Sequence, residues 1–164
     1  MPEQETMERA QEDAREGKSP STQAGEFVRE EIDHIREGKH GAASTKQAIA
    51  IGLSKARRAG VKLNAPERGK TSRETREKAE RDLSKGRSHS RRKPSARRSR
   101  AVSGALNREG HSAASRKSLS KQAKNAARSR GAAARHRSAM KAVQTKRKQG
   151  RSQAAQKAAR TRAA

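Results

Sequence analysis

The side chains that could do chemistry in this chain are mostly cationic. Its 164 residues include 42 lysines and arginines against 17 aspartates and glutamates, which gives a net charge of +25 at neutral pH. Guanidinium and ammonium groups at this density bind phosphates, because each contact releases condensed counterions from the polyanion. The charge therefore predicts a nucleic acid as the partner, with no role for a membrane.

Positive charge increases along the chain. Residues 1–37 hold 5 basic and 11 acidic side chains, residues 38–82 hold 12 and 5, and residues 83–164 hold 25 and 1, the single acid being Glu109. A cationic block of this length repels itself unless a polyanion neutralises it, so we expect most phosphate contacts there. The predicted nucleic-acid-binding residues are Arg57, Arg58, Arg87, Arg91, Arg92, Lys93, Arg97, Arg98, Arg100, Arg116, Lys117, Lys121, Lys124, Arg128, Arg130, Arg135, Arg137, Lys141, Lys146, Arg147, Lys148, Arg151, Lys157, Arg160 and Arg162.

The remaining reactive side chains form no catalytic pattern. The chain has no cysteine, no glycine-rich phosphate loop and no nucleophile elbow. Its five histidines, at positions 34, 40, 89, 111 and 136, lie in polar sequence without the spacing of a zinc motif, so we expect them to be solvated. We predict that the protein is not an enzyme and that it has no catalytic residue, metal ligand, cofactor or small-molecule substrate.

The tail composition also limits the kind of nucleic acid. Base-specific readout needs side chains held rigidly at base edges, and a flexible tail of alanine, lysine and arginine offers none. Single-strand binders stack bases on aromatic rings, but the only aromatic residue here is Phe27. These features favour duplex DNA over RNA and binding without sequence preference. An RNA- or ribosome-associated protein would use the same electrostatics and stays an alternative.

The elements that carry these charges must fold around very little apolar material. Hydrophobic residues make up 29% of the chain, and only 17 residues are Val, Ile, Leu, Met or Phe. Ordering one residue costs roughly 1–2 kcal/mol of backbone entropy, so we expect a small folded part and extensive disorder. The predicted fold is mostly α: a small αα-hairpin followed by a cationic low-complexity tail that forms partial helices.

The hairpin is predicted over residues 19–64. Its first helix starts after Ser19, with Pro20 at the first helical position, or alternatively after Ser21, and it stops at Gly38. The unit is near the lower size limit for independent folding. The same apolar face could therefore form a homodimer or dock a protein partner, and an adaptor is the second alternative. The predicted hairpin core is Phe27, Val28, Ile32, Ile35, Ile49 and Leu53.

The second helix of the hairpin is predicted from residue 45 to residue 58. Ser44 and Gln47 have the spacing of a capping box. Gly60 is the expected stop. Gly52 interrupts the helix-forming residues, and such a glycine is best tolerated where another helix packs closely.

Charge and composition divide the rest of the chain. Residues 1–18 are predicted to be an acidic flexible segment, residues 65–85 a charged helix or spacer capped by Thr71 and Glu74, and residues 86–164 a basic tail. The first part of the tail, up to position 100, lacks helical periodicity and should be coil. The alanine-rich stretches after it should gain helix when phosphates neutralise their charge.

One short sequence recurs. REGKHGAASTK starts at Arg36, REGHSAASRK starts at Arg108, and a shorter copy, REGKSPSTQA, starts at Arg15. Because chance similarity is high among so few residue types, these copies indicate either a duplication or coincidence. The copy at Arg108 lacks the isoleucines that follow the first, so it cannot form the same hairpin.

The stretch STKQAIAIGLSKARRAG, residues 44–60, resembles a motif of small basic bacterial proteins catalogued as a domain of unknown function, which reads K-Q-A-I-A-I-A-L-S-E-A-R-K-A-G. Gly52 and Lys55 depart from that motif. The resemblance implies a DNA-binding role, and the tail is similar in composition to linker-histone tails. The matching residues are Lys46, Gln47, Ala48, Ile49, Ala50, Ile51, Leu53, Ser54, Ala56 and Arg57.

Together these features predict a histone-like, nucleoid-associated protein that binds DNA by neutralising phosphates. No run of 18 apolar residues occurs, and the acidic N-terminus lacks the apolar stretch of a secretory signal. We therefore expect the protein to be cytoplasmic and bound to the nucleoid.

Overall fold

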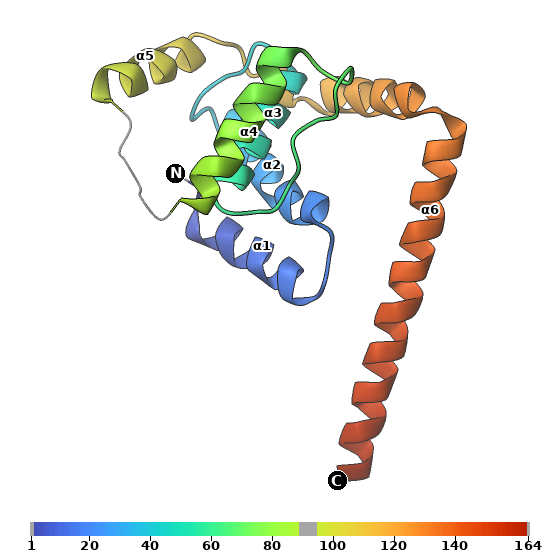
Figure 1. Ribbon diagram of the computed structural model, residues 1–164. Helices are drawn as coiled ribbons and strands as arrows, with labels where there is room; N and C mark the ends of the chain where they lie inside the picture. The colour runs from blue at the N-terminus through green and yellow to red at the C-terminus, as the bar shows by residue number, and fades with distance from the viewer. Residues whose placement is uncertain (1, 89–94, 164) are drawn as a thin grey trace. The chain divides into compact units, whose positions relative to one another are not determined.

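The computed structural model describes residues 2–88 and 95–163, without the side chains of residues 148, 149 and 152–163. The chain divides into two units, Met1–Leu119 and Ser120–Ala164 (Figure 1). Most of the described residues are helical and none of them forms a strand, so the prediction of a mostly α protein is confirmed. The elements are α1 (Gln4–Arg15), α2 (Pro20–Arg36), α3 (Thr45–Arg58), α4 (Arg73–Arg87), α5 (Ala96–Asn107), the 3-10 helix η1 (Ser112–Ala114) and α6 (Arg116–Ala163).

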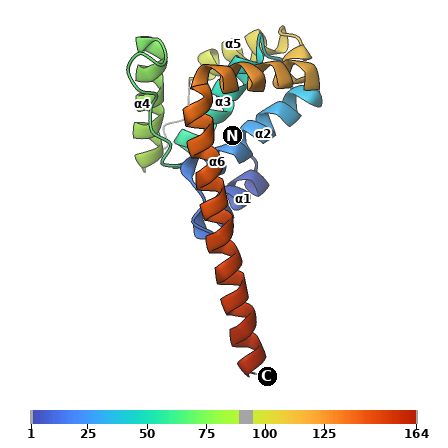
Figure 2. The ribbon, with the colours of Figure 1, turned by 90° about the vertical axis from the view of Figure 1, so that its right-hand side faces the viewer.

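Four helices of the first unit pack in chain order. α1 contacts α2, α2 contacts α3, and α3 contacts α4. Figure 2 shows α3 between α2 and α4. The α2–α3 contact is the most extensive of the three, but neighbours on both sides make this pair part of a larger helical unit.

Local signals explain where α2 and α3 begin. α2 starts at Pro20, as predicted. α3 starts at Thr45, and the Ser44 hydroxyl accepts a hydrogen bond from the backbone N–H of Gln47 at 3.2 Å. The Gln47 side chain accepts from the backbone N–H of Ala43 rather than from that of Ser44, so the reciprocal cap is one residue wider than predicted.

Glycines in the left-handed region end the first three helices. Gly17, Gly38 and Gly60 have φ angles of 72°, 77° and 98°, which glycine adopts without steric cost. After Gly17 the Lys18 N–H donates to the Asp13 carbonyl at 2.8 Å, and the equivalent bond follows each of the other two glycines. The two copies of the sequence REGK therefore make the same helix stop.

The apolar core consists of two clusters rich in alanine. Of the predicted core residues, Phe27, Ile32 and Ile35 are buried, and Val28 and Leu53 pack against the clusters at their edges. One cluster contains Ile32, Ile35, Ala42, Ala48, Ala113 and Ala114, with Val28 and Leu119 at its edge; the other contains Ala10, Ala24, Phe27 and Ala56, with Met7, Leu53, Ala59, Val61 and Leu63 at its edge.

The prediction that Ile49 belongs to the core is wrong, because this residue is half-buried and belongs to neither cluster. The reason is the close approach of α2 and α3. A Cβ atom on Gly52 would lie 2.7 Å from the Cα of Val28 and 3.0 Å from the carbonyl oxygen of Phe27. At this separation the helix contact has room for Gly52 and Ala48, and the longer side chain of Ile49 lies at its margin.

Residues 1–18 differ from the predicted flexible segment, because they contain α1. Thr6, Ala10 and Asp13 of this helix are buried. They recur at i, i+4 and i+7 and so form one helix face. Two of the three are polar, which is why the apolar pattern that predicts a buried face is missing from the sequence.

α4 is the helix of the charged segment, but its cap and its environment differ from the prediction. Its cap is Ser72 rather than Thr71, with the Ser72 hydroxyl accepting from the Thr75 backbone N–H at 3.3 Å. The helix is no solvated spacer, since Ala79 and Asp82 are buried against the unit. It extends into the predicted coil, and α5 begins within the same stretch.

The repeated segment after α5 packs against the α2–α3 connection that it resembles. The Ala42 N–H donates to the Gly110 carbonyl at 3.1 Å, and the Thr45 hydroxyl donates to the Ala113 carbonyl at 2.6 Å. η1 contacts both α2 and α3. The folded unit therefore extends to Leu119, well beyond the predicted start of the tail at residue 86.

The second unit is the rest of α6. Gly131, with φ of 72° and ψ of 167°, interrupts its helical conformation. Residues 120–164 hold 14 lysines and arginines and no aspartate or glutamate. None of the side chains that the structure describes in this unit is buried.

Candidate functional site

The predicted nucleic-acid-binding side chains beyond Asp82 are exposed wherever the structure describes them. Lys121, Lys124 and Arg128 recur at i, i+3 and i+7, so they lie on one face of α6. The other members are distributed over the end of α4, α5 and the remainder of α6. The exposed set is Arg87, Arg97, Arg98, Arg100, Arg116, Lys117, Lys121, Lys124, Arg128, Arg130, Arg135, Arg137, Lys141, Lys146, Arg147 and Arg151.

None of these cations forms an ion pair with another described side chain. Every ion pair among the described side chains lies between Glu3 and Asp82. Glu109 is the only acid that follows Asp82 in the sequence. The exposed set therefore keeps its full charge for an external anion.

Arg57 and Arg58, by contrast, bind groups within the first unit. Arg57 is 8% exposed, and its Nε donates to the Leu63 carbonyl at 3.2 Å. Burial lowers the pKa of the Arg57 guanidinium, while the charge of Asp82 acts in the opposite direction. Arg58 donates from Nε to Asp82 Oδ1 at 2.7 Å. Arg57 is covered, and Arg58, although its side chain is 57% exposed, is paired with Asp82, so neither adds free charge to the interface.

Seven predicted contacts cannot be placed. Arg91, Arg92 and Lys93 lie outside the described residues. The positions at which only the backbone is described are Lys148, Lys157, Arg160 and Arg162.

Acidic side chains of the first unit have internal partners. Lys18 Nζ donates to Asp13 Oδ1 at 2.7 Å, and this bond, followed by that to Glu16, raises the pKa of Lys18. Arg9 pairs with Glu26 at 2.9 Å. The acidic side chains near the N-terminus thus mostly stabilise α1 and the connection that follows it.

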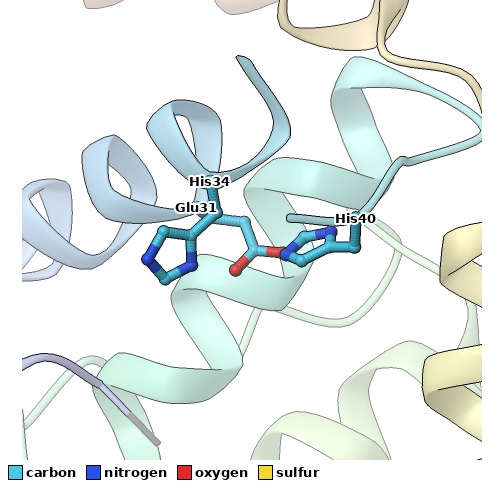
Figure 3. Close-up of side chains that lie close together, drawn as sticks. All are labelled: Glu31, His34 and His40. Atoms are coloured by element: carbon cyan, nitrogen blue, oxygen red, sulfur yellow. The ribbon is translucent and has the colours of Figure 1, made fainter. Parts of the chain in front are cut away.

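A second group of side chains surrounds the α2 carboxylate of Glu31. Figure 3 shows the imidazoles of His34 and His40 on either side of this carboxylate, each with a ring nitrogen turned toward it. The possible ligand atoms of the three residues all lie within 4.8 Å of one another. Glu31 is fully buried and both histidines are half-buried. The prediction that the histidines are solvated is therefore wrong for His34 and His40.

Sequence reasoning missed this group because its members come from two kinds of structure. Glu31 and His34 are spaced i, i+3, which places them on one face of α2, and that pair was a readable signal. His40 lies in the connection after α2, and only the fold brings it to the same place.

Part of the first unit matches a known protein family. Residues 17–69 match a family described as "Family of unknown function (DUF6496)". The match spans α2, α3 and their flanking connections, and it ends before α4. No curated protein matches the chain, and no solved structure matches it.

None of the helices in the described part of the chain is both long and apolar enough to cross a membrane.

Proposed function

We propose that this protein binds duplex DNA without sequence preference, as a histone-like component of the nucleoid. The observation that carries the proposal is the segregation of charge. Basic side chains beyond Asp82 are exposed and form no ion pair wherever they are described, whereas acidic side chains are engaged within the first unit. Such a surface gains free energy from counterion release on any regular array of phosphates.

We assign different roles to the two units. The α2–α3 pair and its neighbours form a folded head, and the acid-free part of α6 supplies a cationic arm for the DNA backbone. The alanine, lysine and arginine residues of the arm offer no rigid platform for holding side chains at base edges, so we expect the arm to respond to phosphate density rather than to sequence. It also lacks the aromatic platforms on which single strands stack, which favours a duplex.

The test compares two full-length variants that lose the same number of charges. The arm variant carries K121Q, K124Q, R128Q and R130Q. The head variant carries K46Q, K62Q, R68Q and K70Q, whose native side chains are exposed and form no ion pair with described residues. Affinity for a duplex of mixed sequence is measured by gel shift over a range of salt concentrations.

We expect the arm variant to reduce the slope of log affinity against log salt by up to about 3.6, at about 0.9 per lost contact on duplex DNA. The head variant should change the slope by less than about one contact. Equal effects of the two variants would show that only net charge matters. A structured RNA tested in parallel distinguishes the alternative, since tighter binding to RNA would overturn the preference for DNA.

A further inference from the structure

The carboxylate of Glu31 lies in an unusual environment. The residue is 0% exposed, and neither of its side-chain oxygens accepts a hydrogen bond. Lys55 Nζ lies 2.7 Å from Oε2 as an ion pair, without the direction of a hydrogen bond. A buried carboxylate is costly unless other groups satisfy its lone pairs. Oε1 therefore needs a further electropositive partner.

In their neutral form, the two imidazoles present lone pairs, not protons, at this position. His34 Nε2 lies 2.8 Å from Glu3 Oε1, and His40 Nδ1 lies 3.1 Å from the Gly41 carbonyl oxygen. Carboxylate and carbonyl oxygens only accept hydrogen bonds, so these two nitrogens carry the protons. In the neutral rings the lone pairs are then on Nδ1 of His34 and Nε2 of His40, and the latter lies 3.4 Å from Glu31 Oε1.

The net charge around Glu31, His34 and His40 favours a bound cation. Glu3, Glu30 and Glu31 contribute three carboxylates, and Lys39 and Lys55 contribute two ammonium groups that pair with them. With neutral imidazoles the local charge is therefore negative. A divalent cation between the three ligands would offset this charge and satisfy the free oxygen of Glu31.

We propose that Glu31, His34 and His40 bind a divalent transition-metal ion of the zinc type. Two imidazole nitrogens and one carboxylate oxygen form a ligand set that suits Zn²⁺ and leaves a further coordination position for water. The contacts of the opposite ring nitrogens with Glu3 and the Gly41 carbonyl are those that orient metal-binding histidines in proteins.

The ion would join α2 to the connection that follows it. Glu31 and His34 lie on α2, and His40 lies two residues beyond the Gly38 stop. Since the metal binds the folded arrangement and not the unfolded chain, it should raise the stability of the first unit. The site lies apart in sequence from the DNA-binding arm, so its presence does not depend on the proposed function.

The test uses the full-length protein, stripped with a chelator and then dialysed. Zn²⁺ is titrated by calorimetry, and Co²⁺ is followed by its visible absorption. We expect one ion per chain, a Co²⁺ spectrum of a four- or five-coordinate site, and a higher melting temperature with Zn²⁺. H40N should weaken Zn²⁺ binding more than tenfold, and H136N, which changes an exposed histidine of α6, should leave it unchanged.

A second variant protects the test against misfolding. E3Q keeps all three ligands and removes the carboxylate that orients His34, so it should weaken binding about 10–100-fold while the protein stays helical. Zn²⁺ binding of wild-type strength in H40N and E3Q, or no binding at all by the wild-type protein, would overturn the proposal. Binding that H136N abolishes would assign the ion to the arm and would also overturn it.

Discussion

At position 52 the absence of a side chain sets how closely two helices approach. A Cβ atom there would meet backbone atoms of Val28 and Phe27, which cannot rotate away as a flexible side chain could. α2 and α3 would have to separate, and the alanine contacts on either side would loosen with them.

We expect Gly52→Ala to lower the free energy of unfolding of the first unit by about 1–3 kcal/mol, the usual cost of overpacking a closed core. Gly25→Ala is the matched control, because Gly25 lies on α2 and a methyl group added there would meet no other atom within 4 Å. It should raise the free energy of unfolding by about 0.5–1 kcal/mol through helix propensity alone. Urea unfolding followed by circular dichroism measures both, and destabilisation by both variants to the same extent would contradict the packing explanation.

At the scale of the elements, α4 is held by a polar contact. Asp82 is 7% exposed and accepts hydrogen bonds from the Ser54 hydroxyl at 2.6 Å and from Arg58 Nε at 2.7 Å. Both donors belong to α3. Since α4 has few apolar residues, this charged acceptor supplies much of the specificity with which the two helices pack.

Asp82→Asn keeps the shape of the side chain and removes its charge. It should lower the free energy of unfolding by about 1–3 kcal/mol, because two partly buried hydrogen bonds weaken and Arg58 loses its counter-charge. Glu80→Gln on the same helix breaks a partly exposed pair with Arg76 and should cost less than about 1 kcal/mol. Hydrogen exchange should also accelerate in α4 of the Asp82 variant before it does so in α2, and uniform acceleration would argue against a local role.

Local signals in the sequence predict much of this element scale. Pro20, the Ser44 cap and the Gly38 stop act through neighbours within five residues, so they could be read without a structure. The roles of Asp82 and Arg58 could not, because each depends on a segment that is distant in the chain. The same holds for the candidate metal group, of which only the two members on α2 share a readable spacing.

At the scale of the whole molecule, the chain separates its charge into a head with paired acids and an arm without them. When the arm is helical, its positively charged side chains lie close together. At low salt their mutual repulsion is only weakly screened. Phosphates that bind these cations remove the repulsion, so helix formation and DNA binding should favour each other.

Circular dichroism at 222 nm tests this coupling. Adding duplex DNA at low salt should increase the helix signal of the full-length protein, after subtraction of the DNA spectrum, and raising the salt concentration should reverse the gain. The variant K121Q/K124Q/R128Q/R130Q should start with more helix and gain less, because part of its repulsion is already gone. An unchanged signal in the wild-type protein upon saturation with DNA would contradict the coupling.

If the arm binds DNA as proposed, its lack of acids limits how many chains a stretch of duplex can accept. Residues 120–164 carry 14 positive charges. As a helix rising about 1.5 Å per residue, the arm has one positive charge about every 5 Å of its length. Duplex DNA has one negative charge about every 1.7 Å. A single arm laid along the duplex thus leaves most of the polymer's charge in place, and about three must share each segment before electroneutrality allows neighbouring duplexes to condense.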